Sequence, residues 1–249
     1  MDPKSSLYPL VDRTMIVMAS DEKNIITLNW LNSIACEKAL TKIHIKSLGE
    51  YMFIFWDNSN IHISGLSVMQ KFEPTQQREL FRTNFKNLFE LVRDGRDVDN
   101  AYLSGSIPPP NNDLWDYLRR MGISLQLLNK TAEGTEQESV DMSLQTMMLR
   151  TAIDRISNPS TIAVLTGDGA GKQLGEGFLS DLNRIKGMGW DIEVYAWEET
   201  CNRYLKDFAE NNGRFISLEK YYYAITFLRE DRYNPTGKQV RPSISLQDI

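Results

Sequence analysis

Three aspartates lie at positions where their carboxylates could share a metal ion. Asp57 directly follows the apolar run 51–56, and Asp168 lies just after the strand expected at 161–166. Asp141 lies in the first turn of an expected helix. Carboxylates held close together repel one another, and a divalent cation relieves that repulsion. Mg²⁺ prefers oxygen ligands and keeps several waters, so two or three carboxylates suffice to hold it. An ion held in this way can activate water and neutralise charge on a phosphodiester.

Each of these aspartates also has a structural interpretation. Asp141 could favour the dipole at the start of its helix. Asp57 and Asp168 could form turns at the ends of their strands. The metal site is the favoured hypothesis because placement directly after a strand occurs twice, and ligands of parallel sheets bind outside the carboxyl ends of the strands.

Short apolar runs alternate with longer amphipathic stretches about five or six times along the chain. The strands are expected at 51–56, 100–104, 123–128, 161–166, 191–196 and 214–218, and the helices at 74–93, 113–121, 139–156, 177–188 and 200–210. Residues 219–230 close the fold. Gly122 is expected to end the helix 113–121, because helix ends commonly need a residue with positive φ. This order predicts an α/β fold with a mostly parallel sheet, helices on both faces and right-handed crossovers.

The two ends of the chain differ from its middle. Residues 1–50 are predicted to be an appendage that contains an amphipathic helix at 28–40. Residues 231–249 contain two prolines and little periodicity, which predicts a flexible tail. The main domain is therefore expected to span residues 51–230.

Composition narrows the class of protein. Among 249 residues, 41% are hydrophobic and the net charge is −5, so wholesale disorder is excluded. Net acidity argues against coating nucleic acid by bulk charge, but it allows a local basic groove. The longest apolar run has six residues, too few to cross a membrane. With no secretory signal expected and only two cysteines, we expect an intracellular protein, cytoplasmic or nuclear. The sequence leaves open whether the chain forms a homo-oligomer.

Several segments together carry a family resemblance. The segments FIFWDNSNIHISG, ESVDMSL and TIAVLTGDG, the last followed by GFLSDLNRIKGMGWDIEVYAW, resemble the NYN domain, a branch of the PIN-like nuclease superfamily. The resemblance covers residues 51–220, and its specific parts are DNSN (57–60) and TGDG (166–169). It implies a PIN-like three-layer α/β/α fold that cleaves single-stranded or structured RNA, endonucleolytically, with Mg²⁺ or Mn²⁺. It also implies that Asp57, Asp141 and Asp168 are metal ligands and that Asn60 orients a ligand or a water, with Asn58 as a weaker candidate for that role.

The sequence departs from the family pattern at two places. Ala170 occupies a position where many relatives carry a further aspartate, and Glu176 on a longer loop is the candidate replacement. About two helical turns after Asp141, the chain offers Met147 and Met148 in place of a second acid. The alternative is therefore a catalytically degraded module on the same fold that binds RNA or a protein.

Two sets of basic residues are candidates for RNA binding. Lys172 lies in the loop 169–175, which matches no nucleotide-binding motif but could rest a phosphate on its backbone amides. A phosphatase or nucleotide-binding protein that uses this loop is a third hypothesis. Arg78, Arg82 and Lys86 recur every four residues and are expected to share one helix face that tracks phosphates. A solvated outer face explains them equally well.

Overall fold

The computed structural model describes residues 15–18, 25–28, 51–106, 112–128, 136–169, 177–230 and 237–249. The chain divides into two units, Met1–Gly49 and Glu50–Ile249. In the first unit, β1 (Met15–Met18) pairs antiparallel with β2 (Ile25–Leu28). The helix predicted at 28–40 lies outside the described residues, apart from Leu28, which ends β2.

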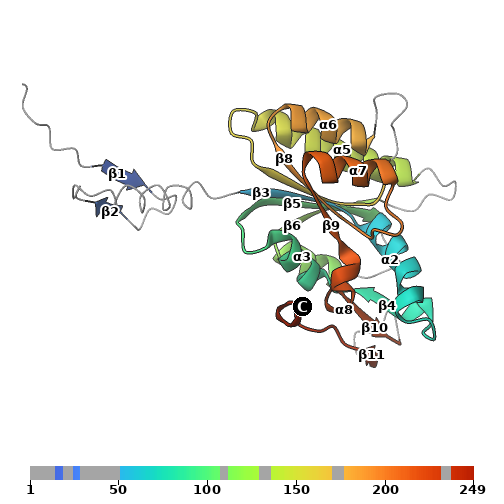
Figure 1. The fold of residues 1–249 in the computed structure, drawn as a ribbon. Helices are drawn as coiled ribbons and strands as arrows, with labels where there is room; N and C mark the ends of the chain where they lie inside the picture. The colour runs from blue at the N-terminus through green and yellow to red at the C-terminus, as the bar shows by residue number, and fades with distance from the viewer. Residues whose placement is uncertain are drawn as a thin grey trace, which may run out of the picture. The chain divides into compact units, whose positions relative to one another are not determined.

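The second unit contains a parallel sheet of six strands in the order β6-β5-β3-β7-β8-β9 (Figure 1). The strands are β3 (Met52–Asp57), β5 (Val98–Ser106), β6 (Ile123–Leu128), β7 (Thr161–Leu165), β8 (Asp191–Ala196) and β9 (Arg214–Ser217). All the strands of the predicted sheet are present, and their ends differ from the predicted ones by at most two residues. Every residue of β3 and β7 is buried, as expected for central strands covered on both faces.

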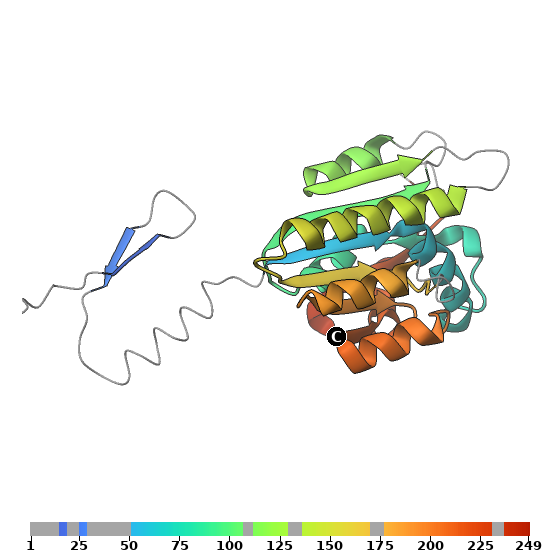
Figure 2. The ribbon, with the colours of Figure 1, turned by 90° about the horizontal axis from the view of Figure 1, so that it is seen from above.

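Helices cover both faces of this sheet. One layer contains α2 (Asn58–Phe72), α3 (Phe85–Arg93) and α4 (Asn112–Arg120). The other contains α5 (Glu136–Asp154), α6 (Phe178–Gly187) and α7 (Arg203–Asn212), the layer that Figure 2 faces. Alternate residues of β3 serve the two cores: Trp56 packs with the first layer and Phe55 with the second. The predicted three-layer α/β/α fold is confirmed.

In the described parts of the chain, no helix combines the length and the apolar character that crossing a bilayer requires.

The segment 74–93 is not the single helix that the sequence predicts. The chain forms α2 earlier, at 58–72, and then the 3₁₀ helix η1 (Arg78–Leu80) and the strand β4 (Phe81–Thr83) before α3 begins. Asn84 starts α3 because its side chain accepts a hydrogen bond from the backbone N–H of Asn87 at 3.1 Å. Helical spacing of apolar residues misleads here because β4 pairs with a strand far away in the sequence.

That distant strand is β10 (Thr226–Arg229), the middle strand of the sheet β11-β10-β4. It follows β9 through the 3₁₀ helix η2 (Leu218–Tyr221) and the short helix α8 (Tyr222–Ile225). The final strand β11 (Gln239–Arg241) precedes the 3₁₀ helix η3 (Leu246–Asp248). The sheet is antiparallel throughout.

Residues 237–249 are folded onto the domain, whereas the sequence predicts a flexible tail over 231–249. The guanidinium of Arg241 donates to the Glu73 carboxylate at 2.6 Å and to Thr226 Oγ1 at 2.8 Å. The Tyr222 hydroxyl donates to the same carboxylate. Local periodicity does not predict this attachment because it depends on partners from α2 and β10.

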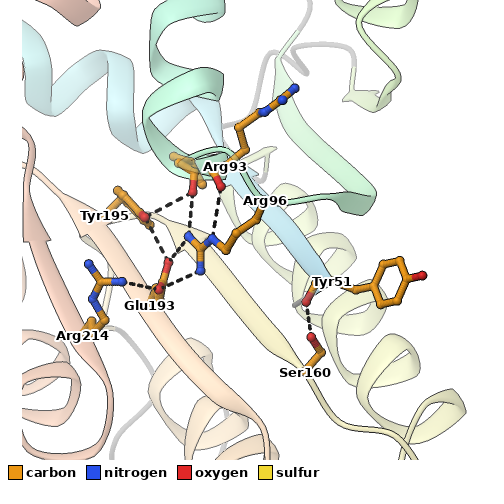
Figure 3. A network of polar contacts seen from close by, with 8 residues as sticks. Tyr51, Arg93, Arg96, Ser160, Glu193, Tyr195 and Arg214 are labelled. Carbon is orange, nitrogen blue, oxygen red and sulfur yellow. Dashed lines mark hydrogen bonds and ion pairs between the residues drawn. The ribbon is translucent and has the colours of Figure 1, made fainter. Parts of the chain in front are cut away.

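A second buried charge network joins β8 to the end of α3 (Figure 3). The Glu193 carboxylate accepts hydrogen bonds from both terminal nitrogens of Arg96 at 3.0 and 2.8 Å, and from Arg214 at 2.9 Å. The Tyr195 hydroxyl also donates to it at 3.0 Å. Burial alone would raise the pKa of Glu193, but the hydrogen bonds and charge of Arg96 bring that pKa below its ordinary value. This network secures the edge of the sheet.

Candidate active site

A row of polar residues lies across the carboxyl edge of the parallel sheet. Asp57, at the end of β3, is in register with Ser104 of β5, which is in register with Gln126 of β6. Thr166 directly follows β7, on the other side of β3. From β3 the chain proceeds outward to β5 and β6 and then returns to β7, so the strand order reverses beside Asp57. Such a switch point is where open α/β sheets bind ligands.

The Asp57 carboxylate is buried and hydrogen-bonded on both oxygens. It is 3% exposed, and Asp57 is also the N-cap of α2. Its Oδ1 accepts a hydrogen bond from the backbone N–H of Asn60 at 3.0 Å, and its Oδ2 accepts one from Thr166 Oγ1 at 3.1 Å. Burial is the main reason that its pKa rises to about 6, and the negative charge of Asp168 raises it further. The two hydrogen bonds oppose this rise by favouring the ionised form.

The loop that carries Asp168 is tied to Asp57 by two side chains. Thr166 Oγ1 accepts a hydrogen bond from the backbone N–H of Asp168 at 3.1 Å, while its own proton goes to Asp57. Asn60 Oδ1 accepts one from the backbone N–H of Gly167 at 2.7 Å. The DNSN and TGDG segments therefore form one hydrogen-bonded unit that places both carboxyl groups at the same edge.

A second loop, between β8 and α7, packs against the Asp168 loop from outside. The backbone N–H of Asn202 donates to the Gly167 carbonyl at 2.8 Å. A Cβ atom added to Gly169 would lie 2.5 Å from Cγ of Asn202, so this position has no room for a side chain. Asn202 could not be predicted from the sequence, since nothing near it signals the contact.

The comparisons with known proteins identify the family. The sequence model of the NYN domain matches residues 51–219. The chain belongs to the NYN domain family. This family is part of the PIN-like nuclease superfamily, so the fold is a nuclease-like one. The crystal structure of a protein of unknown function from Vibrio parahaemolyticus is similar at 15% identity and a TM-score of 0.48, over 68% of this chain and 93% of that one. A comparison with curated proteins finds no match.

Among the predicted acidic and amide site residues whose side chains the structure describes, three lie together. Asp57, Asn60 and Asp168 meet at the edge of the sheet. Asp141 lies in the second turn of α5 rather than the first, because the helix begins at Glu136. Its side chain lies outside the described residues, and so do Glu176 and Lys172. Within the described parts of the chain, no three acidic, histidine or cysteine side chains form a metal-binding group. The full ligand set therefore stays a prediction.

The oxygen atoms of this edge suit a hard cation. Two carboxylates approach each other there, and a third oxygen, Oδ1 of Asn58, is buried without a hydrogen-bond partner among the described residues. Asn58 follows Asp57 directly and packs against Gly105 at the end of β5. Carboxylate and amide oxygens are ligands that Mg²⁺ and Mn²⁺ accept. The donor set thus fits the divalent ion that the NYN family implies.

The predicted basic helix face does not form in the NYN domain. Arg78 lies in η1, Arg82 in β4 and Lys86 in α3, so the three residues do not share a helix face. The Arg82 guanidinium donates to the backbone carbonyls of Glu79 and Phe81 at 2.5 and 2.6 Å. It therefore holds the chain around β4. The prediction that the three residues share one helix face is wrong, and their contact with RNA stays a prediction. The spacing of four residues misled because the segment is not one helix.

Proposed function

We propose that this NYN domain is a Mg²⁺- or Mn²⁺-dependent endoribonuclease. The observation that carries the proposal is the pair Asp57 and Asp168, which Thr166 and Asn60 hold at the switch point of a nuclease-like sheet. When bound there, the divalent ion would supply an activated water and neutralise charge on the phosphodiester. RNA would lie outside the carboxyl ends of β3 and β7.

The protein residues have separate tasks in this mechanism. Asp57 and Asp168 bind the ion through carboxylate oxygens. Asp57, with a pKa of about 6, is mostly ionised at pH 7, and a nearby cation favours that form further. Thr166 and Asn60 keep the two motifs in register, so the carboxylates are already oriented before the ion binds. Such preorganisation lowers the entropic cost of forming the site.

Asp141 and Glu176 are proposed to complete the ligand set. The neighbourhood of Asp141 supports its inclusion, because Ser143, two residues later on α5, donates a hydrogen bond from its hydroxyl to Gln126. Gln126 belongs to the polar row that contains Asp57. The start of α5 therefore lies along the edge where the ion is proposed to bind. Glu176 follows from the family pattern alone.

The test compares cleavage of labelled single-stranded RNA in Mn²⁺, in Mg²⁺ and in chelator. Asp57→Asn and Asp168→Asn should each abolish cleavage while the protein stays folded. Asp191→Asn is the matched control, because Asp191 starts β8 at the opposite edge and its side chain is 80% exposed. Cleavage of a circular RNA would establish endonucleolytic action. Equal turnover by wild type and Asp168→Asn would remove the proposal.

The second candidate is a module that binds RNA without cutting it. Ala170, in place of a family aspartate, favours this candidate. It predicts that the chain retains RNA in gel-shift assays with every divalent ion, that no product forms, and that affinity falls as salt rises.

A further inference from the structure

An exposed tyrosine and arginine begin α7, beside the loop that carries Asp168. Only residues 197–202 separate β8 from α7, so the helix starts at the carboxyl edge of the sheet (Figure 2). Its N-cap, Asn202, contacts Gly167 and Gly169 on the Asp168 loop. Consecutive Cα atoms are 3.8 Å apart, so those of Arg203 and Tyr204 lie within about 8 Å of the Asn202 Cα.

The tyrosine is placed by the helix cap and does not belong to the core. Asn202 Oδ1 accepts a hydrogen bond from the backbone N–H of Tyr204 at 2.9 Å, which fixes the first turn of α7. The apolar side of the helix, Leu205 and Phe208, packs into the core, whereas Tyr204 is 42% exposed. The Arg203 side chain is exposed as well, and its guanidinium carbon lies 5.2 Å from the centre of the Tyr204 ring.

An aromatic ring beside a guanidinium is suited to single-stranded nucleic acid. A nucleobase of any sequence stacks on an aromatic face, and a guanidinium binds phosphate or strengthens the stack. Bases in a duplex are already stacked within it and do not offer their faces. The chain has a net charge of −5, so a polyanion needs local positive groups to approach this edge. Arg78, Arg82 and Lys86 belong to three different elements and do not form the predicted helix face.

We propose that Tyr204 and Arg203 form a nucleotide subsite for single-stranded RNA. Tyr204 stacks on a base next to the scissile phosphate, and Arg203 contacts the phosphate of that nucleotide. The subsite rests on the proposed function for its substrate, and it adds a preference for unpaired RNA over duplex RNA.

Binding is measured by fluorescence anisotropy of a labelled single-stranded RNA, with the full chain in chelator so that no cleavage occurs. Tyr204→Ala should weaken binding about tenfold to a hundredfold, whereas Tyr204→Phe should bind within about twofold of wild type. Tyr51→Ala is the control, because Tyr51 is similarly exposed but precedes β3 at the opposite edge. Arg203→Ala should reduce the slope of log affinity against log salt concentration by about one, the value expected for the loss of one phosphate contact. Binding of duplex RNA should change little in any variant.

A second readout separates stacking from a structural effect. RNA that contains 2-aminopurine should lose fluorescence on binding to wild type and Tyr204→Phe, but not to Tyr204→Leu, which keeps an apolar side chain without an aromatic face. If Tyr204→Ala does not fold, the comparison of Tyr204→Leu with Tyr204→Phe tests the stacking instead. The subsite would be overturned if Tyr204→Leu bound RNA and quenched 2-aminopurine as strongly as wild type does.

Parallel cleavage assays in Mn²⁺ keep the two proposals apart. If no variant cuts RNA but binding still depends on Tyr204, the nuclease proposal fails and the subsite stands. If cleavage depends on Asp57 and Tyr204→Leu binds RNA like wild type, the nuclease proposal stands and the subsite fails.

Discussion

Replacing Asp57 with asparagine should remove a pH-dependent loss of stability while it removes metal binding. The carboxylate is 3% exposed, and its pKa is raised from 3.8 to about 6, chiefly by burial. The folded protein therefore binds a proton at this site more tightly than the unfolded chain does. An amide of the same shape is neutral at every pH, so Asp57→Asn removes the cost of burying the charge. The amide nitrogen cannot accept one of the two hydrogen bonds that the carboxylate accepts, but that loss is the same at every pH.

The sign and size follow from linkage. Because the folded-state pKa is the higher one, the stability contributed by protonated Asp57 is fully present below about pH 3.8 and is lost as pH rises through about 6. Raising the pKa from 3.8 to about 6, at 1.36 kcal/mol for each pH unit, costs about 3 kcal/mol of stability at pH 7. The free energy of unfolding of Asp57→Asn should not fall in this way as pH rises. The free energy of unfolding of the variant, relative to wild type, should then rise by about 2 kcal/mol between pH 4 and pH 7.

Urea unfolding in chelator, followed at several pH values between 4 and 8, measures the difference. The contributions of other titrating groups to the pH dependence of unfolding largely cancel, because both proteins contain these groups. Asp191→Asn, at an exposed position, should show almost no difference from wild type. Saturating Mn²⁺ should stabilise wild type, by about 2.7 kcal/mol at a hundred times the dissociation constant, and leave Asp57→Asn unchanged. A difference that does not vary with pH would refute the reasoning about burial, and equal stabilisation of both proteins by Mn²⁺ would refute the assignment of the ligand.

Three further predictions test the loop beside Asp57 and the attachment of β11. Thr166→Val removes a hydrogen bond to the Asp57 carboxylate that is worth about 1.5 kcal/mol. The pKa of Asp57 should therefore rise further, and Mn²⁺ titrations should show that binding needs a higher pH. Thr161→Val, at the other end of β7, should leave the pH dependence of Mn²⁺ binding unchanged. Gly169→Ala should lower the cleavage rate about a hundredfold, because its Cβ would lie 2.5 Å from Asn202 Cγ. Adding Asn202→Gly should restore most of the activity. If the double variant stayed as slow as Gly169→Ala, the proposed packing would be contradicted. Arg241→Ala removes the ion pair of the Glu73 carboxylate, which is 11% exposed and keeps the Tyr222 hydroxyl as a donor, and should lower the free energy of unfolding by about 2 kcal/mol in urea. A loss below about 0.5 kcal/mol would mean that β11 adds little.

Features that depend on neighbouring residues could be predicted from the sequence. The strand β7 is a short apolar run, and its predicted end differs from the observed one by a single residue. Gly122 has φ +82° at the end of α4, in agreement with its expected role. The approach of Asp57 to Asp168 was also predictable, because parallel strands place their carboxyl ends along one edge and both residues lie at such ends.

Features that depend on distant partners were decided by the tertiary structure. The strand β4 forms because β10, more than 140 residues later, supplies its hydrogen bonds, and the same apolar spacing would also fit a helix. The segment 237–249 is ordered because Arg241 reaches the half-buried carboxylate of Glu73. Asn202 meets Gly169 across two loops that share no local signal. Local patterns determine which elements form when hydrophobic spacing is unambiguous, but only the assembled chain determines which side chains become neighbours.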